Sequence, residues 1–204
     1  MDPSKIAIPT LAAGASAASV GGYFYATSKQ ATVLDKVKES LKDHHRVLSS
    51  KDDSAWEKFK EVYKASKEKQ ISDVSEEKVN EWCESTLKET FTQDKYDKVM
   101  TWCVVYDRSI KDHVGTSLLP SSGEGVDGKW QKAWEKFEKD NSNAGVLKLS
   151  DDALVGSSKP SGKEDGGKAL NKWCNDRYSM KMYELGAEDL SKKVEKWCSE
   201  TQGT

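Results

Sequence analysis

Large apolar residues recur every three or four positions along most of the chain. Trp56, Phe59 and Tyr63 stand at i, i+3 and i+7, which is the spacing of one face of an α-helix. Ser54 and Glu57 form a predicted capping box in front of this stripe. Stripes of the same period follow at 79–87, 96–106, 130–137, 170–178 and 190–198. Few stretches alternate between apolar and polar residues, so the pattern predicts an all-α protein with little sheet.

One arrangement of motifs occurs twice. Ala-Trp-Glu-Lys-Phe stands at 55–59 and again at 133–137, and two Trp-Cys pairs follow each copy. The same motifs in the same order indicate an internal duplication. A Pro/Gly/Ser-rich linker, 120–128, separates the copies. We therefore predict two tandem modules of about three helices each, 51–119 and 129–204, with a long surface loop at 141–167 in the second.

The N-terminal segment 1–29 differs from the rest of the chain. No charged residue occurs between Ile6 and Ser28, which is long enough to span a bilayer, and three aromatic residues stand near its end. We predict a single transmembrane helix that serves as a signal-anchor. The small residues of the stretch "ASA" also fit a cleaved signal peptide, which is the alternative.

Two further features belong to the N-terminal part of the chain. Gly14, Ala18 and Gly22 would share one face of the membrane helix and let two such helices pack closely. The same spacing also arises by chance in a segment so rich in alanine and glycine. Residues 30–50 follow as a predicted polar lead-in helix or stalk, with a narrow apolar stripe.

Every cysteine follows a tryptophan, and an aliphatic residue stands four positions before each cysteine. On a helix the aliphatic residue and the cysteine share the inner face, while the tryptophan lies beside them at the border of a small core. Together with the repeated Ala-Trp-Glu-Lys-Phe motif, this gives the predicted core aromatics Trp56, Trp82, Trp102, Trp134, Trp173 and Trp197.

The four cysteines allow three interpretations. Disulfides Cys83–Cys103 and Cys174–Cys198 would tie the second helix of each module to the third, which suits small cores in an outward-facing protein. Alternatively, reduced cysteines would pack as small apolar residues. A zinc site is the third interpretation, but the sequence has no C-x-x-C pair and no well-placed histidine.

Charge and composition argue against several classes of function. The chain has 32 basic and 34 acidic residues, and its basic residues are almost all lysine, which does not favour nucleic-acid binding. The stretch 162–169 approaches a phosphate-binding loop, but Ala169 replaces the hydroxyl residue that would hold magnesium. No nucleophile-and-base pair stands out, so we predict a protein that is not an enzyme and needs no cofactor or metal.

The Trp-Cys phrases carry a resemblance. The stretches "LAAGASAASVGGYFYA", "KVMTWCVVYDRSIKD" and "KKVEKWCSET" resemble a large paralogous family of short surface or membrane proteins in haemotropic mycoplasmas. The resemblance covers the whole chain and departs at "CVVYDRS", where tyrosine replaces an expected proline. It implies a surface-exposed, antigenically variable role on a wall-less bacterium that lives on red blood cells, and it assigns no functional residues.

These features lead to one expected function and one alternative. We expect a membrane-anchored, single-pass surface protein with its C-terminal body outside the cell. It would act without catalysis, by contacting a host protein or by displaying antigen to antibody. The alternative is a membrane-associated scaffold that assembles with itself.

Overall fold

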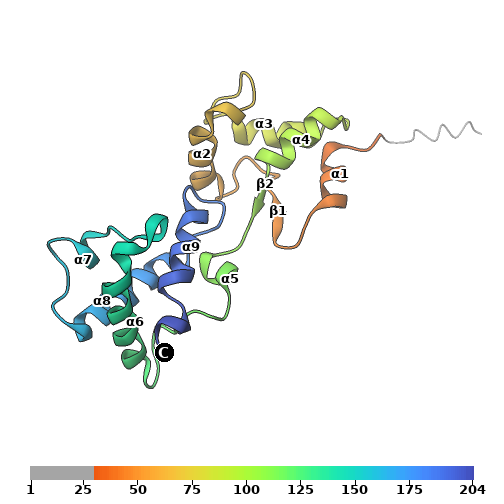
Figure 1. The fold of residues 1–204 in the computed structure, drawn as a ribbon. Coiled ribbons are helices and arrows are strands. Elements are labelled where there is room, and N and C mark those ends of the chain that lie inside the picture. Colours follow the sequence, from red (N-terminus) through yellow and green to blue (C-terminus); the bar gives the residue numbers. More distant parts are fainter. Residues whose placement is uncertain (1–29) are drawn as a thin grey trace, which may run out of the picture.

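The computed structural model describes residues 30–204, which form two lobes joined by a short extended connection (Figure 1). Most of the described chain is helical, which confirms the predicted all-α class. The first lobe contains α1 (Val33–Ser40), β1 (His45–Val47), α2 (Trp56–Ala65), α3 (Val79–Thr86), α4 (Gln93–Trp102) and β2 (Val104–Tyr106). The second contains α5 (Ile110–Val114), α6 (Val126–Asp140), α7 (Asp152–Val155), α8 (Lys163–Tyr178) and α9 (Ala187–Trp197).

Each lobe has its own hydrophobic core, and the two cores divide the chain earlier than the sequence suggested. Val33, Val37 and Leu48 are fully buried in the first core, so the residues expected to form a stalk are part of the first lobe. Ile110 and Leu119 belong to the second core. We therefore call 32–106 module 1 and 109–204 module 2.

The same short helix opens both modules. The Thr32 hydroxyl accepts the N–H of Asp35 at 3.2 Å in α1, and the Ser109 hydroxyl accepts the N–H of Asp112 at 3.0 Å in α5. Such a hydroxyl cap satisfies a backbone donor that the first turn leaves unpaired. Each cap residue also forms an isolated β-bridge: Thr32 pairs with Thr90, after α3, and Ser109 pairs with Lys181, after α8. The duplication therefore extends over the opening helices, which lie before the motifs that identified it.

Equivalent backbone bonds close the two modules. The N–H of Leu48 donates to the carbonyl oxygen of Cys103 at 2.8 Å, and the N–H of Leu119 donates to that of Cys198 at the same distance. In module 1 this bond extends the two-stranded antiparallel sheet, in which Val47 pairs with Val104. Each closing cysteine thus lies against the segment that leads into the first long helix, α2 or α6.

Two predictions about local structure need correction, and a third lies outside the described residues. The capping box Ser54–Glu57 is wrong, because α2 begins at Trp56 and the carboxylate of Asp53 accepts the N–H of Ala55 at 2.9 Å instead. The predicted loop 141–167 holds two 3-10 turns, α7 and the start of α8. Among residues 30–204, no helix is both long and apolar enough to cross a membrane. The anchor 1–29, with Gly14, Ala18 and Gly22, lies outside the described residues.

Candidate functional site

Both predicted disulfides are present. Cys83 bonds to Cys103 with their Cα atoms 5.6 Å apart, and Cys174 bonds to Cys198 with a Cα separation of 5.9 Å. All four residues are fully buried. Because each sulfur is bonded to another sulfur, the alternatives of reduced packing cysteines and of a zinc site are excluded for these residues.

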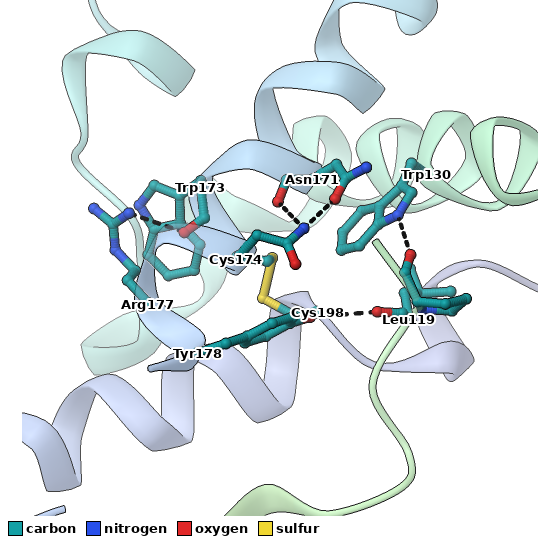
Figure 2. Close-up of a disulfide and its surroundings, with 10 residues drawn as sticks. Leu119, Trp130, Asn171, Trp173, Cys174, Arg177, Tyr178 and Cys198 are labelled. Atoms are coloured by element: carbon teal, nitrogen blue, oxygen red, sulfur yellow. Dashed lines mark hydrogen bonds between the residues drawn. A yellow bond between two sulfur atoms is a disulfide. The ribbon is translucent and has the colours of Figure 1, made fainter. Parts of the chain in front are cut away.

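Large side chains enclose the second bridge (Figure 2). Tyr178 is buried beside the sulfurs, and this burial raises the pKa of its hydroxyl to about 12. The guanidinium of Arg177 lies 4.2 Å from the ring centroid of Trp173, a cation–π contact at the outer side of the site. Reactive cysteines lie in partly exposed positions, so a bridge buried in this way serves to hold α8 and α9 together.

The predicted core tryptophans are buried, with one exception. Five of the six are at most 6% exposed, namely Trp56, Trp102, Trp134, Trp173 and Trp197. Trp82 is only half-buried at the edge of the first core. Trp130 belongs to the predicted apolar stripe 130–137 but not to the predicted core aromatics; it is 1% exposed, and its indole N–H donates to the carbonyl oxygen of Pro120 at 2.9 Å.

The glycine pair of the apparent phosphate-binding loop has a packing role. Gly166 and Gly167 lie inside helix α8, which begins at Lys163, and both face α6. A Cβ atom added to Gly166 would lie 2.2 Å from the Trp134 ring, and one added to Gly167 would lie 3.0 Å from the backbone of Gln131. The glycines therefore allow the two helices to approach closely, which accounts for their position without a nucleotide.

Polar residues at the junction join the two modules. The carboxylate of Asp107 forms an ion pair with Lys181 Nζ of module 2 at 2.9 Å and accepts a hydrogen bond from Arg46 Nε of module 1 at 2.6 Å. Arg46 also contacts Asp53 at 2.5 Å. The contact with Lys181, aided by that with Arg46, lowers the pKa of Asp107. We call Arg46, Asp53, Asp107 and Lys181 the junction cluster.

An open groove of about 530 Å³ lies beside the junction cluster. On one side it is lined by Phe59 and Val62 of α2 and by β2, and on the other by the turn between α8 and α9. The ring of Tyr183 from this turn stands edge-on to Phe59, with centroids 6.5 Å apart. We call this the inter-module groove. Its volume is in the range of small-molecule clefts, but the groove is open to solvent along its length.

The inter-module groove depends on a difference between the two copies. The bridged cysteines are 20 residues apart in module 1 and 24 apart in module 2. The β-bridge residues Thr90 and Lys181 each stand seven positions after the first cysteine, so the four additional residues lie beyond Lys181. They form the turn 182–185 that contacts module 1. No prediction from the sequence included this groove, because the unequal spacing of the Trp-Cys pairs marks the added turn but does not show what the turn packs against.

Comparison of the chain with protein-family models, curated proteins and solved structures gives no match. The assignment of a function therefore depends on the chemistry of the modules themselves.

Proposed function

We propose that the chain is a membrane-anchored surface protein whose two disulfide-bonded modules face the outside of the cell and act by binding rather than by catalysis. The observation that carries the proposal is the pair of buried disulfides, Cys83–Cys103 and Cys174–Cys198. Structural disulfides persist in oxidising compartments and are rare where thiol reductants are abundant. The uncharged segment 6–28 supplies the proposed anchor.

The binding role is host-facing in this proposal, with a host protein or an antibody as the partner. Two small modules with a shared groove offer a contact surface that a single module lacks. Deletion of the protein is expected to reduce attachment to host cells or recognition by antibodies. Unchanged attachment together with unchanged antibody recognition would contradict the binding role.

Labelling of intact cells tests the location. A membrane-impermeant, lysine-reactive tag is applied, and the protein is analysed by mass spectrometry after alkylation with and without prior reduction. We expect tagged lysines in both modules and cysteines that accept alkylation only after reduction under denaturing conditions. An untagged body with free thiols would place the protein in the cytosol and overturn the proposal. A cytosolic protein of known abundance serves as the control for cell lysis.

A further inference from the structure

We propose that the inter-module groove binds a cationic segment of a partner polypeptide that carries at least one large apolar side chain. This inference rests on the proposed binding function and names the chemistry of the partner. The groove is built by both modules, and its lining combines apolar side chains with carboxylates.

The turn 182–185 adds apolar side chains to the groove that the fold of a module does not require. Module 1 makes the corresponding turn without the four additional residues, so 182–185 is not required for a module to close. Tyr183 is used in the contact with Phe59. Leu185 remains 53% exposed at the groove, whose lining also includes Val62 and the buried Val104. A partner's apolar side chain placed in the groove would remove the exposed surface of this leucine from water, together with that of the apolar residues that share the lining.

The negative charge of the groove lining favours a positively charged partner. The charged residues that line it are Glu184, Glu188 and Asp189, and no lysine or arginine is part of the described lining. Lys192 pairs with Glu188 at 2.9 Å and approaches Asp189 at 3.8 Å, which leaves an excess of negative charge. Carboxylates beside an apolar surface favour a partner with lysine or arginine next to its apolar residue, and they oppose an acidic partner.

Module 2 contains a matched control for this charge. Glu164 and Asp165 open α8 and surround Lys168 in the same way that Glu188 and Asp189 open α9 and surround Lys192. Both acidic pairs complement the positive end of a helix, so this role alone does not distinguish them. Only the pair on α9 borders the inter-module groove. Neutralising each pair in turn therefore separates groove binding from a general effect of charge.

Fluorescence anisotropy with three short labelled peptides tests the inference on the disulfide-bonded protein. One peptide combines lysine with leucine, one combines glutamate with leucine, and one combines lysine with serine. We expect the lysine–leucine peptide to bind at least about ten-fold more tightly than the other two. Equal binding of the glutamate–leucine peptide, or no binding of the lysine–leucine peptide, would overturn the inference.

Variants locate the binding. Leu185→Ser and the double variant Glu188→Gln/Asp189→Asn are each expected to weaken binding of the lysine–leucine peptide by about ten-fold. The controls Val146→Ser, at a valine that is 90% exposed elsewhere, and Glu164→Gln/Asp165→Asn are expected to leave it unchanged. Equal effects of variants and controls would place the peptide outside the groove and contradict the inference.

Sedimentation of the protein without peptide tests whether a second copy of the chain fills the groove instead. A dimer that Leu185→Ser dissociates would show that a second copy fills the groove, and the inference would be wrong. A monomer is expected. The outcomes are also separable from those of the proposed function, because cell-surface labelling can succeed whether or not the peptide binds.

Discussion

Gly166 shows how much the packing of α6 against α8 depends on one hydrogen atom. A Cβ atom added to Gly166 would lie 2.2 Å from the ring of Trp134, which is completely buried, so the ring or the helix would have to shift. We expect Gly166→Ala to lower the free energy of unfolding by about 1–3 kcal/mol, because overpacking outweighs the better helix propensity of alanine. Chemical denaturation measures the change.

A second glycine provides the control for this substitution. Gly128 lies in α6 with nothing within 4 Å of an added Cβ. Gly128→Ala should therefore raise the free energy of unfolding by up to about 1 kcal/mol. If both substitutions stabilise the protein, close packing of α6 and α8 at Gly166 is refuted.

Two unlike residues perform the same task in the two modules. The Tyr63 hydroxyl accepts the N–H of Ile71 at 2.9 Å and also contacts a carbonyl oxygen of the same loop. In module 2 the Asn141 side chain accepts the N–H of Leu149 at 2.8 Å and donates to its carbonyl oxygen. A tryptophan of the last helix also binds each loop. The indole N–H of Trp102 donates to the carbonyl oxygen of Lys69, and that of Trp197 donates to the carbonyl oxygen of Leu147, in each case two residues before the loop residue named above.

Removal of the hydroxyl of Tyr63 tests its role in this loop. Tyr63→Phe leaves the buried N–H of Ile71 without its partner, and we expect a loss of about 1–3 kcal/mol in the free energy of unfolding. The same substitution at Tyr96, whose hydroxyl meets Ser40 at an exposed position, should cost less than about 1 kcal/mol. Equal losses in thermal or denaturant unfolding would contradict this account.

At the scale of the helix, the disulfides compensate for short elements. In module 1, α3 has 8 residues and α4 has 10, so neither would be stable alone. Helices of this length gain their stability from packing and from the cross-link. The bridge fixes α3 against α4 and removes conformations from the unfolded chain.

Replacement of one bridge should weaken the protein substantially. We expect Cys83→Ala/Cys103→Ala to lower the free energy of unfolding by about 3 kcal/mol, as the chain-entropy argument gives for a loop of 20 residues. Guanidinium denaturation followed by tryptophan fluorescence measures this loss. The corresponding variant at Cys174 and Cys198 should lose a similar amount, and a loss below about 1 kcal/mol in either would show that the helices pack without the bridge.

The sequence predicted the main helices of both modules but not all their boundaries. Apolar spacing identified α2, α3, α4, α6, α8 and α9, and the two disulfides that the structure contains were one of three interpretations of the cysteines. The cap of α2 was misplaced because a carboxylate, Asp53, competes with the nearby Ser54 for the backbone donors. The opening helices α1 and α5 have different apolar content, and only their shared caps and bridges reveal that they correspond.

At the scale of the whole molecule, the inter-module groove was beyond sequence reasoning, because it joins residues about 120 positions apart, such as Phe59 and Tyr183. Internal repeats predict how each module folds, and they carry little information on how the modules meet. The contact between the modules arises where the copies differ, at the turn 182–185, whose Tyr183 meets Phe59.

The junction cluster should make stability depend on pH. Contacts with Lys181 and Arg46 lower the pKa of Asp107, and contact with Arg46 lowers that of Asp53. Because both folded-state pKa values lie below the ordinary value near 3.9, the carboxylates stabilise the folded protein above about pH 4. This contribution is lost as the pH falls through the lowered pKa values.

Asp107→Asn isolates this effect. At pH 7 we expect a loss of about 1 kcal/mol in the free energy of unfolding, and the difference from the unaltered protein should shrink as the pH falls below about 4. Asp94→Asn, in an exposed pair with Lys98, should change stability by less than about 0.5 kcal/mol. A difference that grows on acidification would contradict the assigned sign.

The two disulfides also limit how far the molecule can be stretched. Their loops enclose 20 and 24 residues, and an extended chain spans roughly 3.5 Å per residue. Force applied between the ends of the two modules would therefore leave about 150 Å of chain unable to extend. A protein anchored at one end and held by a partner at the other would unfold under tension to a reduced length, with both cross-linked loops intact.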